Sequence, residues 1–90
     1  MSNLERDLKI VNKEGLHARP AAMFVKTSNR FGSEIWVSKD GEQVNGKSIM
    51  GVMMLAAEHG STIVIRAAGS DSGDALEALQ SLVANRFGEE

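Results

Sequence analysis

The chain has no cysteine, a single proline and no long hydrophobic run. Without cysteine it cannot form a disulfide or a thiolate metal site. Its apolar stretches are far too short to cross a bilayer, and residues 1–7 are polar and lack the apolar stretch of a signal peptide. The two histidines are far apart in sequence and have no nearby carboxylate pairs, which argues against a metal site. We therefore expect a cytoplasmic protein with no metal and no membrane insertion.

The chain also lacks an excess of positive charge. Ten Lys and Arg residues are set against twelve Asp and Glu residues, and the net charge is −2. No global basic field points to nucleic acid as a partner. With 90 residues, of which 42% are hydrophobic, the composition is that of one small folded domain covering residues 1–90.

Alternating and helical patterns predict seven elements in the order βαββαβα. The expected strands are residues 6–11, 33–38, 42–44 and 61–67, and Asp40-Gly41 is a turn signal between the second and third. The expected helices are residues 18–31, residues 49–57 closed by Gly60, and a last one capped by Asp71 or Ser72. Helices and antiparallel strands in so short a chain favour an α+β sandwich, with one sheet and the helices on one face.

The hexapeptide Gly15-Leu16-His17-Ala18-Arg19-Pro20 opens the first predicted helix. A helix N-terminus presents unpaired N–H groups and a partial positive charge. Neutral imidazole is a good nucleophile near pH 7 and also departs readily, while the fork of Arg19 suits phosphate oxygens. The motif therefore predicts a phosphoryl group carried on His17. The alternative is that His17 only caps the helix and that Arg19 is a solvated charge.

A second motif begins at Ser48, a preferred type of helix cap. The seven residues after it are apolar nearly all round, although a short surface helix needs only one apolar stripe. We expect Val52 and Leu55 to face the core. The residues expected to form an adaptable partner-binding surface are Ile49, Met50 and Met53, together with Met23 of the first helix. The alternative is that these side chains only fill the core.

The stretches Gly15–Ala22 and Asn45–Leu55 together resemble the HPr family, the histidine-containing phosphocarriers of the bacterial phosphoenolpyruvate-dependent phosphotransferase system. The separation of the motifs, the chain length and the element order agree as well, so the resemblance covers essentially the whole chain. It implies an open-faced β-sandwich in which three helices cover a four-stranded antiparallel sheet.

The resemblance also implies how such a protein works. His17 would accept phosphate on Nδ1 from phospho-Enzyme I and pass it to an EIIA-type domain. Ser48 matches the serine that HPr kinase/phosphorylase modifies in lineages with that enzyme. The chain would turn over only with partner proteins, so it is not expected to be an enzyme. We expect a monomer without a cofactor, because phosphoenolpyruvate and Mg²⁺ act at Enzyme I.

Two branches of the family remain open. Residues 12–15 and the tail Gly88-Glu89-Glu90 resemble the nitrogen-related NPr branch, whereas the serine motif resembles HPr proteins under kinase control. The regulatory paralogue Crh lacks the active histidine, so the presence of His17 argues against it. One rival function is a regulatory binding module controlled through Ser48 without transport flux. A small phosphohydrolase is disfavoured, because the sequence shows no second histidine or carboxylate placed as an acid/base partner of His17.

Overall fold

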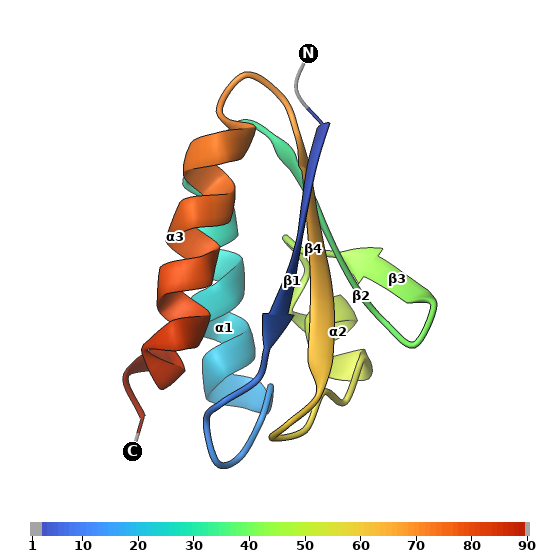
Figure 1. The fold of residues 1–90 in the computed structure, drawn as a ribbon, viewed down its shortest axis with the longest axis vertical. Helices are drawn as coiled ribbons and strands as arrows, with labels where there is room; N and C mark the ends of the chain where they lie inside the picture. Colours follow the sequence, from blue (N-terminus) through green and yellow to red (C-terminus); the bar gives the residue numbers. More distant parts are fainter. Residues whose placement is uncertain (1–2, 90) are drawn as a thin grey trace.

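The computed structural model describes residues 3–89, so the tail residue Glu90 lies outside the described residues. The elements are β1 (Asn3–Lys9), α1 (Ala18–Ser28), β2 (Glu34–Lys39), β3 (Glu42–Asn45), α2 (Ile49–Met54), β4 (Thr62–Ala68), α3 (Ser72–Ala84) and the short 3₁₀ helix η1 (Arg86–Gly88). The predicted order βαββαβα is confirmed (Figure 1). The helix η1 was not predicted.

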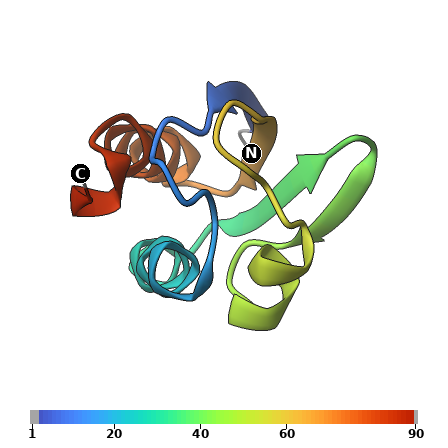
Figure 2. The same cartoon turned by 90° about the horizontal axis from the view of Figure 1, so that it is seen from below.

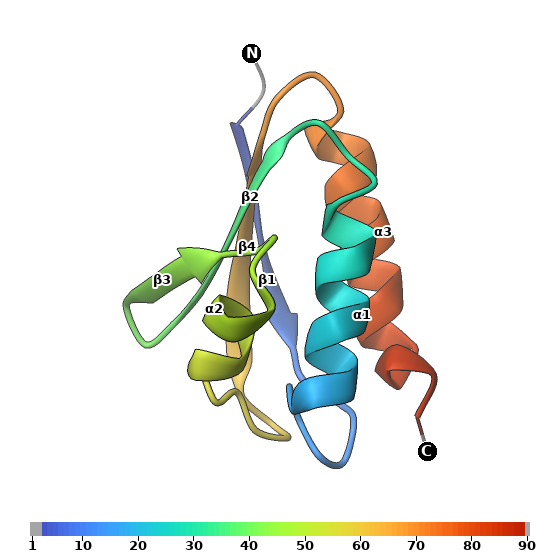
Figure 3. The same ribbon diagram turned by 180° about the vertical axis from the view of Figure 1, so that it is seen from behind.

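The four strands form one sheet in the order β1-β4-β2-β3, and every neighbouring pair is antiparallel. All three α-helices lie on the same side of this sheet, as the end-on view shows (Figure 2). The helices α1 and α3 run side by side, and α2 lies near β3 (Figure 3). The predicted fold class, an α+β sandwich with one uncovered sheet face, is therefore confirmed.

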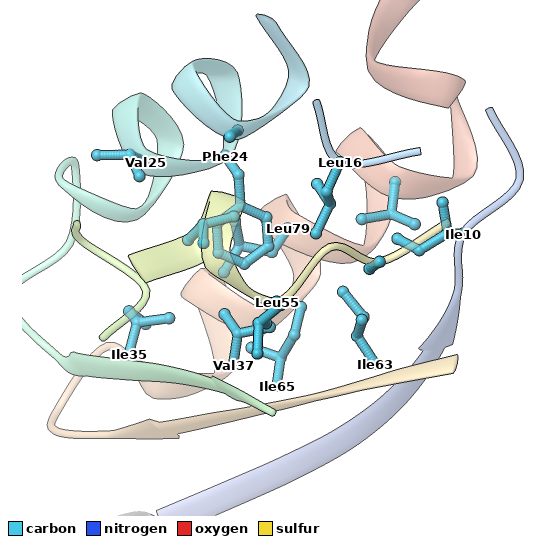
Figure 4. Close-up of a cluster of buried hydrophobic side chains, with 14 of the residues drawn as sticks. Ile10, Leu16, Phe24, Val25, Ile35, Val37, Leu55, Ile63, Ile65 and Leu79 are labelled. Carbon is cyan, nitrogen blue, oxygen red and sulfur yellow. The ribbon is translucent and has the colours of Figure 1, made fainter. Parts of the chain in front are cut away.

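The core lies between the sheet and the helices. Strand residues that alternate along β2 and β4, such as Ile35, Val37 and Ile65, point toward the helices and are 0–2% exposed (Figure 4). Phe24 of α1 and Leu79 of α3 meet them from the other side, as helical periodicity predicts. This apolar contact fixes α1 against the sheet, which also fixes where α1 begins.

The predicted end of α2 is wrong. The helix stops at Met54 rather than at residue 57, and Ala56 adopts a left-handed conformation with φ of 50°. The carbonyl of Ala57 then accepts a hydrogen bond from the Leu16 N–H at 2.8 Å. Leaving the helix costs local hydrogen bonds, but it lets residues 55–57 support the loop before α1. The helix α1 also ends early, at Ser28 rather than at residue 31.

The start of α3 also differs from the prediction, in which Asp71 or Ser72 caps the helix. Asp71 occupies the N-cap position, but its carboxylate does not cap the helix. It accepts hydrogen bonds from the backbone N–H groups of Gly32 and Ser33, each at 2.9 Å, and from the Ser33 hydroxyl. The Ser33 hydroxyl and the Gly32 N–H stabilise the charged form, so the pKa of Asp71 is lowered. The carboxylate thus ties the segment after α1 to the beginning of α3.

The described residues contain neither a candidate membrane span nor a candidate metal cluster. None of the helices within residues 3–89 combines the length and the apolar character that a bilayer crossing needs. Within the same residues, no cluster of three or more His, Asp or Glu side chains is suited to hold a metal ion.

Candidate functional site

The loop before α1 is held tightly against the segment that follows α2. Gly15 has a φ of +72°, and a Cβ added there would lie 2.4 Å from the carbonyl oxygen of Ala57. The neighbouring Leu16 is buried, and its N–H donates to that same oxygen at 2.8 Å. Only glycine permits both the left-handed conformation and this close approach. The loop therefore presents the next residue, His17, at a defined place.

His17 is the N-cap residue of α1, and its carbonyl accepts the first helical hydrogen bond from the Ala21 N–H at 2.9 Å. Its side chain makes no capping bond and is 42% exposed. Pro20 has no N–H, so Ala18 and Arg19 carry the helix-start N–H groups that lack intrahelical partners. The first turn contains no acidic side chain. An exposed imidazole therefore lies beside donors that are available to an anion.

A carboxylate lies against the ring, contrary to the prediction that His17 has no such partner. The Nε2 atom of His17 is 3.1 Å from Oε2 of Glu89. The other carboxylate oxygen of Glu89 accepts from Nδ2 of Asn12 at 3.0 Å, and that same Nδ2 donates to the Gly15 carbonyl at 2.7 Å. A carboxylate can only accept, so the hydrogen of a neutral His17 ring belongs on Nε2. The ring nitrogen with the lone pair is then Nδ1.

The sequence did not identify Glu89 or Asn12 as neighbours of the His17 ring. Glu89 is 72 positions from His17, and nothing in the pattern of the tail signals the contact. Asn12 is completely buried, and its backbone carbonyl accepts from Gly15 N–H in a turn. Asparagine followed by glycine three residues later is a turn signal that could have marked Asn12, though not its role beside the ring.

Arg19 lies in the first turn of α1 and is exposed. Its guanidinium makes no hydrogen bond or ion pair with any part of the chain that the structure describes. Arg19 follows His17 by two residues. Its long cationic side chain can therefore turn toward an anion held at the start of the helix.

The short helix α2 presents an apolar surface close to His17. One shallow groove is lined by His17, Leu16, Met53 and Ala57, with the acidic residues Glu14 and Glu58 also in its lining. Val52 and Leu55 are buried, as predicted. The exposed residues, which we call the α2 patch, are Ile49 (45% exposed), Met50 (73%), Met53 (41%) and Met54 (67%). Met54 was not among the predicted surface residues, and Met23 is half-buried against the core.

Ser48 caps α2, as predicted. Its Oγ accepts a hydrogen bond from the Gly51 N–H at 3.1 Å, and the residue is half-buried. The preceding Lys47 directs its ammonium group to the Phe31 carbonyl at 2.8 Å. The hydroxyl of Ser48 therefore lies at the beginning of the α2 patch, and the ammonium group of the neighbouring Lys47 is bonded elsewhere.

The chain is similar to known proteins over nearly its whole length. The family model "PTS HPr component phosphorylation site" matches residues 4–85. The phosphocarrier protein HPr of Cupriavidus necator is 51% identical over 86 residues, which are 96% of this chain and 97% of that protein. The HPr-like protein Crh of Halalkalibacterium halodurans is 50% identical over 80 residues, 89% of this chain and 95% of that one.

A solved structure is similar over the same length. The crystal structure of HPr-C-His from Thermoanaerobacter tengcongensis has a TM-score of 0.93 and 49% identity, and the match covers 97% of this chain and 98% of that one. The match to the family model and the identity to relatives over nearly the whole chain lead to one conclusion. The chain belongs to the HPr family, the phosphocarriers of the bacterial phosphotransferase system.

Proposed function

We propose that His17 is the residue that carries the phosphoryl group, taking it from phospho-Enzyme I and giving it to an EIIA-type domain. One observation carries the proposal. The exposed ring of His17 has its Nε2 occupied by Glu89, which leaves Nδ1 as the nitrogen with the lone pair, and His17 is itself the N-cap residue of a helix whose start has no side-chain cap. This arrangement offers a nucleophile and an anion site in one place.

The chemistry mainly needs positioning and charge stabilisation. The N–H groups of Ala18 and Arg19 can bond the phosphoryl oxygens, and the Arg19 guanidinium can reach them as a mobile cation. An anion at an exposed helix start gains about 0.3–1 kcal/mol, and up to about 2 kcal/mol when it is partly buried. A modest gain suits a carrier, because a phosphate held too tightly could not be passed on.

Docking would use the apolar surface beside the ring. The α2 patch and the groove that Met53 shares with His17 form a continuous place for a partner protein. Exposed methionines adapt to different shapes, which suits a protein that must fit a donor and an acceptor in turn. Half-buried Met23 would form the edge of this surface rather than its centre.

Ser48 would serve as a control point on the same surface. A phosphate on its Oγ would carry roughly −1.5 to −2 charge and would sit next to Ile49 and Met50. The serine already caps α2, so the phosphate would change partner binding more than the fold. The test compares Ser48→Asp with Ser48→Ala as substrates of Enzyme I. Equal rates for Ser48→Asp and wild type would refute this control.

The experiment for the carrier role is mass spectrometry after incubation with Enzyme I, phosphoenolpyruvate and Mg²⁺. The wild type should gain one acid-labile phosphoryl group, and His17→Ala should gain none. His59→Ala is the matched control, because it removes the other, exposed histidine and should be phosphorylated normally. No gain on the wild type, with an Enzyme I shown to be active, would favour the regulatory binding module. Spontaneous loss of the phosphoryl group as a catalytic turnover would favour a hydrolase.

We propose that this function needs only one copy of a single domain. The buried apolar residues form one cluster, as expected for a single domain. Light scattering of the purified protein should therefore report a particle near the 9.7 kDa of the chain.

A further inference from the structure

The end of the chain makes an unusual turn. After α3, Arg86 and Phe87 both have left-handed φ angles, of 57° and 54°, and Gly88 follows with 75°. Such angles cost free energy for residues with a side chain, so something in the fold must offset them. Phe87 is 2% exposed and belongs to the core cluster. The turn is therefore anchored, and it redirects the chain at a fixed point.

This anchored turn brings Glu89 to the active ring. The turn η1 and the first turn of α1 lie at the same end of the molecule (Figure 1). The side chain of Glu89 is only 15% exposed, and each of its oxygens has its own partner, Nε2 of His17 at 3.1 Å and Nδ2 of Asn12 at 3.0 Å. Asn12 is completely buried, and both neighbours of its Nδ2 are acceptors, so its amide orientation is settled by chemistry. The carboxylate is thus held on two sides.

We propose that Glu89 is a positioning residue for phosphoryl transfer: it holds the hydrogen of His17 on Nε2 and balances the charge that the ring gains when Nδ1 is phosphorylated. The inference rests on the proposed carrier role of His17. It assigns a function to a strained turn and to a buried asparagine that the transfer reaction itself does not explain.

The step balances without a proton leaving the ring. The lone pair of Nδ1 forms the bond to phosphorus while the bond between phosphorus and the donor atom breaks, and the donor atom keeps that electron pair. Nε2 keeps its hydrogen, so the phosphorylated ring is a cation whose N–H points at the carboxylate of Glu89. Donation to the acceptor reverses these changes. A carboxylate facing an N–H that becomes more positive favours the phosphorylated state.

The opposite effect of Glu89 is also conceivable on electrostatic grounds, since a carboxylate repels a phosphoryl group. The geometry argues against it as the dominant effect. The carboxylate is bonded at Nε2, whereas the incoming group meets Nδ1 and the N–H donors at the start of α1. Attraction to the directly bonded N–H acts at 3.1 Å, and the repulsion acts across the ring and through solvent.

The test has two readouts on wild type, Glu89→Ala and Glu89→Gln. Nitrogen-15 shifts of the ring at alkaline pH report the tautomer without any partner protein. Transfer kinetics from phospho-Enzyme I separate kcat from KM. Glu77→Ala is the matched control, because it removes an exposed glutamate of α3 and the same charge.

In the wild type we expect hydrogen on Nε2 and a lone pair on Nδ1, and in Glu89→Ala a mixture of tautomers. The kcat of Glu89→Ala should fall roughly two- to fivefold, the range for a partly exposed ion pair, with KM unchanged. Gln offers one acceptor to two donors, so Glu89→Gln should lie between wild type and Glu89→Ala. Glu77→Ala should match wild type in both readouts.

Three results would overturn the inference: unchanged ring shifts in Glu89→Ala, an equal or higher kcat, or a change in KM alone. These outcomes differ from a failure of the proposed function, in which the wild type itself would not be phosphorylated. The ring shifts remain informative in that case, because they need no Enzyme I.

Discussion

The contact between Gly15 and Ala57 allows the cost of one methyl group to be worked out. In Gly15→Ala the new Cβ would lie 2.4 Å from the Ala57 carbonyl oxygen and 2.9 Å from the Cα of Glu58, so backbone atoms must move. The left-handed angle of +72° costs alanine about 1–2 kcal/mol. Loss of the bond from the Leu16 N–H to Ala57 adds about 0.5–1.5 kcal/mol. We expect the free energy of unfolding to fall by about 1.5–3.5 kcal/mol.

Gly60→Ala is the matched control for this change. Gly60 also has a positive φ, of +90°, but a Cβ there would meet nothing within 4 Å. It should therefore show only the backbone cost of about 1–2 kcal/mol. A domain of 90 residues has a stability of about 5–13 kcal/mol, so both variants should still fold.

Urea unfolding, followed by the fluorescence of the single tryptophan, Trp36, measures both variants. The steric argument is refuted if Gly15→Ala loses no more stability than Gly60→Ala. Displacement of the loop should also move His17, so Gly15→Ala should accept phosphate more slowly than Gly60→Ala.

Three further predictions concern a loop contact, the α2 patch and the Arg19 guanidinium. The Ser33 hydroxyl and the Gly32 N–H lower the pKa of Asp71 in the folded state. The charged carboxylate therefore stabilises the folded protein at a pH above the pKa of the unfolded state, and this contribution is lost as the pH falls through the folded-state pKa. Asp71→Asn should thus be less stable than wild type at neutral pH, and the two unfolding curves should converge in acid; a constant difference would contradict this linkage. Val52→Ala removes the two methyl groups of a fully buried side chain and should lower the free energy of unfolding by about 2 kcal/mol. Met50→Ala, at a site 73% exposed, should change it by about 0.5 kcal/mol or less. If Met50→Ala leaves KM for Enzyme I unchanged, the patch is not the docking surface. Arg19→Ala should slow transfer from phospho-Enzyme I roughly tenfold, as expected for the loss of a hydrogen bond to a charged group. Arg30→Ala, which removes another exposed arginine of the chain, serves as the control. Equal transfer rates for Arg19→Ala and wild type would exclude a role for the Arg19 guanidinium.

The sequence alone determined the element order and the position of His17 at the start of a helix. These features depend on signals that are local in the chain. Alternation places Ile35 and Val37 on the inner face of β2, and the proline in the first turn marks the beginning of α1. Ser48 was identified as a cap for the same reason, because the Gly51 N–H that it bonds is only three residues away.

Tertiary contacts decided where α2 ends and what surrounds the imidazole. The helix stops at Met54, and the Ala57 carbonyl accepts a hydrogen bond from the N–H of Leu16, which is 41 residues earlier in the chain. Asp71 leaves its own helix uncapped because Gly32 and Ser33 present two N–H groups to it. No local pattern contains either partner.

The contact between Glu89 and His17 shows the same limit at the proposed phosphorylation site. Its residues are 72 positions apart, and the left-handed turn at Arg86 and Phe87 that joins them has no glycine at those two positions to reveal it. Periodicity and capping rules describe what each segment prefers by itself, so they locate His17 at the start of α1. The carboxylate that faces Nε2 of His17 belongs to a side chain held there by a turn that is anchored through the buried Phe87.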